Sequence, residues 1–305
     1  MRDNRKTWQL MSDTSSSIYP LAQEVMQEQF EAHFTERRFY TPCLVARGLA
    51  PNPITVEVYS KRNPYANPSG INNLLVDMAS AGYLDQDGNG GYQLSAKGAV
   101  AVSTINDTFY SHINKVDPFP ADKREELAAL LAKLVVTATE AELDNGNLCL
   151  NISFNGHPKV EPGTLAVIDQ RIDDLHAFRD DAHISAWTPT GVDGHTWEVL
   201  SFVWNGEADT VEKLVERLPF RNYTADDYKK TLDDLAQRGW IEPRGKRYKI
   251  TEKGRKIRED AEAATDANFF GPWEVLTDDE FSRLGELLDE LKKTNIKFAE
   301  QTKAA

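Results

Sequence analysis

Hydrophobic residues recur with helical spacing in the segment between residues 67 and 82. Positions i, i+3, i+4 and i+7 of one helical face are occupied by Ile71, Leu74, Leu75 and Met78. Asn67 and Pro68 suit the N-cap and the first turn of such a helix, and Gly82 ends it. A short apolar strand, a glycine-rich turn at 87–91 and a second strand follow. The pattern predicts one helix followed by a two-stranded hairpin.

The same order of residue types occurs a second time. T-V-E at 55–57 returns at 210–212, A-G-Y-L at 81–84 returns as R-G-W-I at 238–241, and 91–98 corresponds to 247–254. In the second copy Thr224 suits the N-cap, Tyr228 and Leu232 continue the apolar face, and Gly239 ends it. A repeat of this kind indicates duplicated structural units. We therefore predict a mainly α fold with small β wings, built from tandem winged helix-turn-helix domains related by a pseudo-two-fold.

Further amphipathic helices flank each copy. Helices are predicted at 18–34 and 163–187, before the two copies, and a leucine-rich helix is predicted after each. The matching leucines are Leu127, Leu130, Leu131 and Leu134 in the first copy, and Leu284, Leu287, Leu288 and Leu291 in the second. The predicted organisation is a disordered tail (1–17), a first winged-helix domain (18–140), a linker (141–162) and a second winged-helix domain (163–298). Alternating apolar residues within 148–154 predict a short strand in the linker.

Composition fits two globular domains. The chain has 305 residues, 40% of them hydrophobic, and no apolar run approaches the length of a membrane span. Its N-terminus carries charges where a secretory signal would be apolar. Cys43 and Cys149 lie far apart in sequence, which suits a reducing compartment better than a disulfide framework. We expect a cytoplasmic protein with no membrane partner.

Charge is distributed unevenly between the two predicted wings. The protein has a formal net charge of −13, yet residues 243–258 contain eight basic residues and one acid. The matching stretch of the first copy, 85–100, carries two acids and one lysine. A basic wing in an acidic protein is explained by contact with DNA phosphates, which we assign to Arg244, Lys246 and Arg247. The alternative is a solvated basic face paired with nearby acids.

The two predicted recognition helices differ in the same way. Asn72 and Asn73 lie opposite the apolar face of the first, and asparagine can bind both edge atoms of adenine. Lys229 and Lys230 lie on the second, beside several aspartates. We predict all four as DNA-binding residues, with solvation of the helix surface as the alternative.

A polar cluster is predicted on the helix that ends near Trp187. Spacings of three and four residues bring together the side chains of His176, Arg179, Asp180, His183 and Trp187. The cluster could bind an anionic ligand, or it could be a structural network that joins the two halves. No paired metal-ligand motif, no nucleophile with its base and no phosphate-binding glycine loop is present, so we predict no metal site, cofactor or catalytic residue.

The order of long helix, winged helix and long helix resembles the MarR-type winged-helix regulators. The tandem arrangement, the run from Leu175 to His183 and the following Trp187-Thr188-Pro189 are similar to the SalK-like group. This resemblance implies a monomer with an internal pseudo-dimer, and a pocket for a small aromatic or phenolic effector. Three functions follow, in order of preference: a DNA-binding transcriptional regulator responsive to a small aromatic or anionic effector, a ligand-sequestering protein that has lost DNA binding, and an enzyme that uses the cluster at 176–187.

Overall fold

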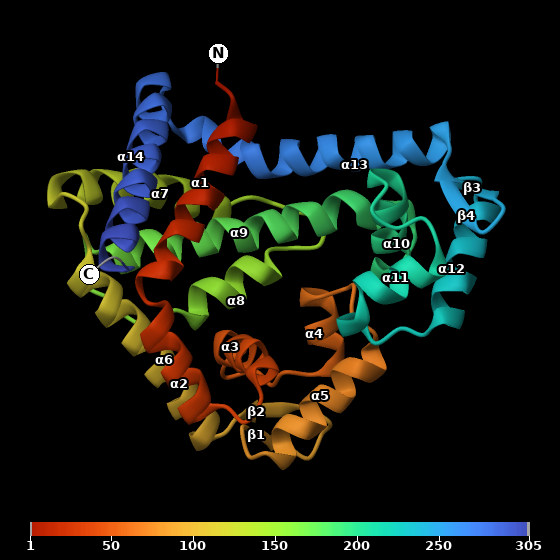
Figure 1. Cartoon of the computed structure of the whole chain (residues 1–305), viewed down its shortest axis with the longest axis horizontal. Coiled ribbons are helices and arrows are strands. Elements are labelled where there is room, and N and C mark those ends of the chain that lie inside the picture. Colours follow the sequence, from red (N-terminus) through yellow and green to blue (C-terminus); the bar gives the residue numbers. More distant parts are fainter. Residues whose placement is uncertain (1, 304–305) are drawn as a thin grey trace.

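The computed structural model describes residues 2–303. The chain is mainly helical and has two small antiparallel sheets of two strands each (Figure 1), as the sequence predicts. Within the described residues, no helix is both long and apolar enough to span a bilayer.

The first helix-and-hairpin segment forms from local signals. Its elements are α3 (Tyr40–Leu49), α4 (Val56–Arg62), α5 (Pro68–Ser80), β1 (Leu84–Gln86), β2 (Tyr92–Leu94) and α6 (Ala96–Val116). The side chain of Asn67 accepts the Ser69 N–H at 2.9 Å and starts α5. Gly82 ends the helix with a φ of +79°, a left-handed conformation that favours glycine.

The second segment has the same order of elements. These are α10 (Gly194–Asn205), α11 (Val211–Arg217), the short helix η4 (Pro219–Arg221), α12 (Ala225–Gln237), β3 (Ile241–Arg244), β4 (Arg247–Ile250) and α13 (Glu252–Phe270). A capping box between Thr224 and Asp227 starts α12. Gly254 in α13 and Gly98 in α6 occupy matching places, because a Cβ on either would lie within 2.2 Å of the carbonyl oxygen of Trp240 or Tyr83.

Further helices lie outside the two segments. α7 (Ala121–Thr139), α8 (Leu148–Gly156) and α9 (Leu165–Trp187) come between them, α2 (Gln23–His33) precedes the first, and α14 (Asp278–Lys303) follows the second. α9 crosses the molecule and packs against α7, α8 and α13 (Figure 1). All eight leucines matched in the sequence are buried in one hydrophobic core. A smaller core lies within the second segment, around Trp197, Tyr228 and Leu232.

The prediction of a disordered tail is wrong. Residues 4–18 form α1 (Asn4–Ile18), which packs along α14 and buries Met11 and Ile18 completely. Its inner face also contains Thr7 and Thr14, and the Thr14 hydroxyl donates to the Leu288 carbonyl at 3.1 Å. Threonines on the buried face concealed the amphipathic pattern. The predicted helix at 18–34 is also divided, since α1 ends at Ile18 and α2 begins at Gln23.

The predicted linker strand is wrong as well. Residues 148–156 form the helix α8, which packs between α3 and α9. Both carboxylate oxygens of Asp181 accept hydrogen bonds at 2.8 Å, from the backbone N–H groups of Cys149 and Leu150. This carboxylate from α9 satisfies the first turn of α8, a contact that no local pattern could indicate.

Candidate functional site

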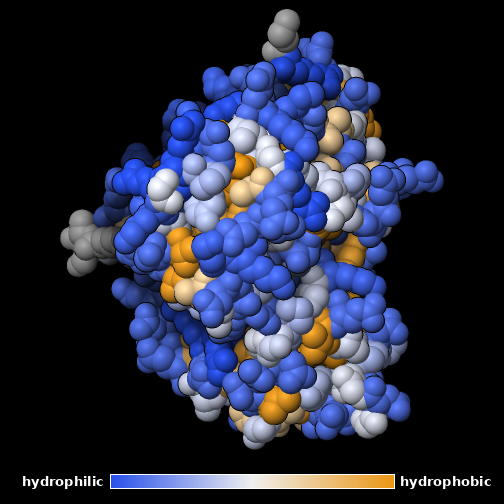
Figure 2. Space-filling model, turned by 90° about the vertical axis from the view of Figure 1, so that its right-hand side faces the viewer, coloured by the Kyte–Doolittle hydropathy of each residue, from blue (hydrophilic) through white to orange (hydrophobic). Residues whose placement is uncertain are grey.

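The predicted basic residues of the second segment lie on the surface. Lys229 and Lys230 project from α12, and Arg244, Lys246 and Arg247 from the β3–β4 hairpin; all five are exposed. The hairpin and α12 lie at the right of Figure 1, and Figure 2 shows this side as largely hydrophilic, with scattered apolar patches.

Nearby acids contact part of this basic surface. Lys229 pairs with Asp233 at 2.5 Å and Arg244 pairs with Glu242 at 2.7 Å. Arg247 lies 3.6 Å from Asp209. Lys230 and Lys246 have no such ion pair within residues 2–303. Because exposed ion pairs contribute little energy, the paired side chains remain free to exchange partners.

The basic surface is smaller than the residue count indicates. Arg258 is only 4% exposed, so it cannot contact phosphate at the surface. Lys253 donates to the Arg238 carbonyl at 2.9 Å, and Lys256 pairs with Asp260 at 3.0 Å. The sequence count therefore overstates the charge that faces outward.

The first segment lacks a comparable surface. Asn72 and Asn73 are exposed on α5, as predicted. The turn of its hairpin is organised by Asp87, whose carboxylate accepts the N–H groups of Asn89 and Gly91 at 2.8 and 2.9 Å. This acid occupies the place where the second hairpin has basic residues.

The N-terminus of α5 packs against the second segment. The backbone N–H of Asn67 donates to the Arg221 carbonyl at 3.1 Å, and its side-chain amide donates to the Asn222 carbonyl at 3.2 Å. A Cβ on Gly70 would lie 2.7 Å from the Asn222 side chain. The first turn of α5 therefore lies directly against the turn that precedes α12.

Partly buried polar contacts surround this junction. The Arg221 guanidinium pairs with Glu198 at 2.7 Å and donates to the Asn63 side chain at 3.1 Å. A Cβ on Gly194 would lie 2.2 Å from the Pro64 carbonyl oxygen. The two segments are thus closely fitted here, with no room for an added methyl group.

Four of the five predicted cluster residues line one cavity. His176, Arg179, Asp180 and His183 project from α9 into a space of about 440 Å³ that α10 and α13 also border. Trp187 lies outside this lining and stacks on Trp197 with ring centres 5.8 Å apart.

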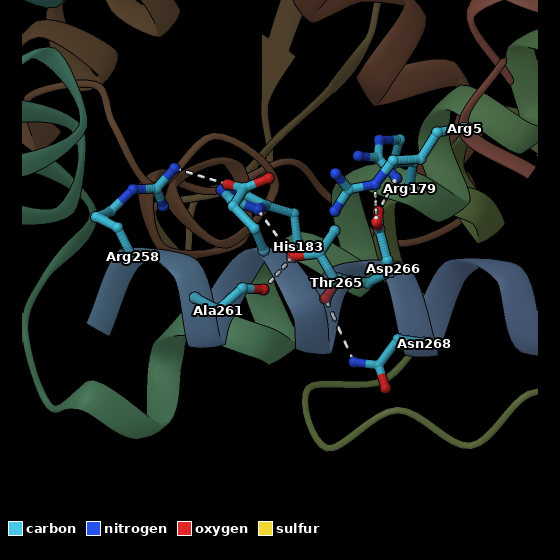
Figure 3. A network of polar contacts seen from close by, with 10 residues as sticks. Arg5, Arg179, His183, Arg258, Ala261, Thr265, Asp266 and Asn268 are labelled. Atoms are coloured by element: carbon cyan, nitrogen blue, oxygen red, sulfur yellow. Dashed lines mark hydrogen bonds and ion pairs between the residues drawn. The ribbon is translucent and has the colours of Figure 1, made fainter. Parts of the chain in front are cut away.

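Hydrogen bonds fix the protonation state of His183. The indole N–H of Trp197 donates to Nε2 of His183 at 3.3 Å, so the ring proton is on Nδ1. Nδ1 donates to the Thr265 hydroxyl at 3.2 Å, and this hydroxyl donates to the Ala261 carbonyl at 2.8 Å (Figure 3). Burial lowers the pKa of His183 to about 4. The imidazole is therefore neutral at pH 7.

Other cluster residues connect distant helices. Arg179 lies 3.5 Å from Asp266, which Arg5 of α1 also contacts (Figure 3). Asp180 pairs with Arg62 of α4 at 3.0 Å. His176 packs against Trp8 of α1, with ring centres 4.5 Å apart. These contacts support the structural interpretation of the cluster.

Arg258, one of the eight basic residues counted in 243–258, lines this cavity. Its guanidinium lies over the rings of Trp197 and Trp204, at 4.4 and 4.9 Å, and pairs with Glu262 at 2.7 Å. Its Nε and Nη1 have no hydrogen-bond partner among the described residues. In the sequence, only the four-residue spacing between Arg258 and Glu262 indicated this ion pair.

The structure places a serine, a histidine and a carboxylate together elsewhere, but not as a catalytic triad. Asp174 accepts from the Ser153 hydroxyl at 2.8 Å and lies 2.9 Å from Nε2 of His157. The serine oxygen is 3.4 Å from the same Nε2. A triad needs the serine and the carboxylate on different ring nitrogens. Among the described residues, no group of three or more potential ligands suits a metal ion.

Comparison with known proteins adds one finding. A family model described as a helix-turn-helix family matches residues 164–299, which extend from the start of α9 into α14. Residues 164–299 form a helix-turn-helix domain. No curated protein and no solved structure matches the chain.

Within this helix-turn-helix domain, α12 follows α11 after residues 218–224, which include η4. Lys229 and Lys230 lie on α12, and Arg244, Lys246 and Arg247 lie on the adjacent hairpin. The first half of the chain, with Asn72 and Asn73, lies outside the matched residues.

Proposed function

We propose that the protein is a DNA-binding transcriptional regulator of MarR-like type, whose helix-turn-helix domain makes the principal DNA contacts. The observation that carries this proposal is the position of five exposed basic side chains on α12 and the β3–β4 hairpin of the matched domain. A recognition helix and its hairpin are the elements that meet the groove and the phosphates in such domains.

We propose that the first segment is also a winged helix. A pseudo-two-fold within the one polypeptide would relate it to the helix-turn-helix domain at 164–299. The sequence repeat and the identical order of elements support this arrangement. The matching close approaches of Gly98 and Gly254 to a strand carbonyl support it further. On this proposal the functional unit is a monomer with an internal pseudo-dimer.

The junction between α5 and η4 affects how DNA is read. Asn67, the N-cap of α5, is hydrogen-bonded to Arg221, and three residues later Thr224 caps α12. Three residues span at most about 11 Å. Half-sites one helical turn apart require recognition elements about 34 Å apart. We therefore propose that α12 reads one groove and that the start of α5 does not read a second.

The test is a polarisation titration of the whole protein with labelled genomic fragments over a salt series. We expect binding that weakens steeply with salt, because neutralised phosphates release counterions. No binding at low salt would contradict the DNA-binding proposal and favour the sequestering alternative.

A second proposed function is capture of a small anionic effector in the cavity of about 440 Å³. The Arg258 guanidinium, which lines this cavity, favours it, because a guanidinium attracts and hydrogen-bonds anionic groups. We propose binding and not catalysis here, since Trp197 and Thr265 occupy both nitrogens of His183.

Benzoate is a suitable probe of the effector proposal, with tryptophan fluorescence as the readout. Arg258→Gln should lose benzoate binding, whereas Arg255→Gln, an exposed change on the same helix, should retain it. Equal binding by the two variants would contradict the proposal.

A further inference from the structure

A second cavity lies in the first half of the molecule. It has a volume of about 520 Å³ and is bordered by α2, α3, α6 and α9, whose places are seen in Figure 1. Five of its twelve lining residues are aromatic: Tyr19, Phe30, Tyr40, Phe109 and Tyr110. It meets a smaller hollow of about 310 Å³, since Tyr40, Asn106 and Asp173 line both.

Two carboxyl groups face this aromatic cavity without partners. Asp169 and Asp173 are four residues apart on α9, so they lie on the same helical face. Asp169 is only 7% exposed, and neither carboxyl has a hydrogen bond or ion pair within residues 2–303. Asp173 is more exposed and lines both hollows. Packing of the surrounding helices around the two groups raises the pKa of both carboxyls.

A third polar group in the cavity also has an unused hydrogen-bonding capacity. Asn106 is 8% exposed, and its side-chain oxygen accepts from the Tyr40 hydroxyl at 2.8 Å. Its side-chain N–H groups have no partner in the part of the chain that the structure describes. Buried amides are ordinarily satisfied at both ends, so an occupant that accepts a hydrogen bond would complete this group.

The surrounding charges do not neutralise the two carboxyls. Arg37 lies over the Phe30 ring at the exposed edge of the cavity, with 4.6 Å between guanidinium and ring centre, and pairs with no acid in residues 2–303. His157 is occupied by Asp174, at 2.9 Å. The other titratable groups that line the cavity are the Tyr19, Tyr40 and Tyr110 hydroxyls. Among residues 2–303, neither Asp169 nor Asp173 therefore has a positive partner.

We propose that this aromatic cavity binds a small organic cation, a protonated amine with an apolar body whose ammonium group lies between Asp169 and Asp173. Carboxylates accept ammonium hydrogen bonds, and aromatic ring faces attract cations. A volume of about 520 Å³ is in the usual range for small-molecule sites. The inference does not depend on DNA binding.

The experiment is calorimetric titration of the whole protein at pH 8 with 2-phenylethylamine and with 2-phenylethanol. These probes share the aromatic ring and differ in the ammonium group. We expect the amine to bind at least about tenfold more tightly than the alcohol, as one lost charge-assisted hydrogen bond predicts. Equal affinities, or no amine binding at millimolar concentration, would overturn the proposal.

Variants locate the site. Asp169→Asn and Asp173→Asn should each weaken amine binding about tenfold or more. Asp107→Asn is the matched control, because Asp107 is exposed on α6 and has no ion pair within residues 2–303. Unchanged affinity in both α9 variants would overturn the proposal.

Thermal unfolding without amine separates loss of the site from loss of the fold. Asp169→Asn should unfold at the same or a higher temperature than the parent at pH 8, because it removes an unpaired carboxyl that is only 7% exposed. If the α9 variants do not fold, the comparison of amine with alcohol on the parent protein still decides the proposal.

Discussion

The backbone N–H of Asn67 donates to the carbonyl oxygen of Arg221 at 3.1 Å and joins the two helix-and-hairpin segments at the start of α5. The same short region contains the Arg221–Glu198 ion pair and the close approach of Gly194 to Pro64. The two segments are thus held at a fixed distance, and only the second presents an outward basic surface.

Reversal of the hairpin charges should weaken DNA binding most. Because each lost phosphate contact flattens the slope of log affinity against log salt by about 0.9, the triple variant Arg244→Glu, Lys246→Glu and Arg247→Glu should flatten it by about two to three. The slope is measured by polarisation over a salt series.

The control for this variant has the same change in net charge elsewhere. Lys159→Glu, Lys293→Glu and Lys297→Glu alter exposed residues outside α10–α13. This control should keep most of the parental slope, and equal slopes in the two triple variants would show that net charge alone determines binding.

Single substitutions on α12 and α5 should have different effects on the salt dependence of DNA binding. Lys230→Ala removes a cation that has no ion pair within residues 2–303, so we expect the salt slope to fall by about 0.9. Asn72→Ala removes a neutral side chain and should leave the slope unchanged. A slope loss in Asn72→Ala would show that α5 also approaches the phosphates.

A methyl group at Gly194 should destabilise the junction. Gly194→Ala places a Cβ 2.2 Å from the Pro64 carbonyl oxygen, and overpacking of this kind typically costs about 1–3 kcal/mol. Gly271→Ala is the control, since a Cβ there has no neighbour within 4 Å. Urea unfolding at pH 7 measures both, and similar midpoints would contradict the close fit.

Protonation of His183 should make stability depend on pH. Its folded-state pKa of about 4 is below the ordinary value of 6.5, so the unfolded chain takes up the proton first. The stability that the neutral ring contributes is present above pH 6.5 and is lost as pH falls toward 4, by at most about 3 kcal/mol.

The carboxyls of Asp169 and Asp173 act in the opposite direction, so the His183 contribution is measured by difference. Urea midpoints at pH 7 and pH 5 are compared for the parent and for His183→Gln, which retains a donor and an acceptor. The variant should lose less stability on acidification. An equal loss would assign the acid sensitivity to groups other than His183.

Sequence predicted the elements whose signals are local. α5 and α12 begin at the predicted caps, Asn67 and Thr224, and both hairpins follow the predicted glycines. α1 was missed because its buried face includes Thr7 and Thr14, whose burial depends on α14. α8 was misassigned because its first N–H groups are satisfied by Asp181 of the next helix, α9, 32 and 31 residues along the chain.

In the candidate sites, too, the sequence predicted only what depends on local spacing. The proximity of His176, Arg179, Asp180 and His183 follows from spacing along one helix, and the structure brings them to one cavity. Thr265, which bonds His183, and Arg258, which lines the same cavity, come from α13. The periodicity of α9 cannot predict contacts with residues of another helix. Charge counting also cannot distinguish an exposed arginine from the buried Arg258.

The pairing of the terminal helices has a mechanical consequence. α1 and α14 run in the same direction, with Arg2 beside Asp278 at one end and Ser17 bonded to Asn295 at the other (Figure 1). A force applied between residues 2 and 303 would load this pair in shear, because the two points of attachment lie at opposite ends of it. The contacts along the helices would then resist the force together and would not open one after another.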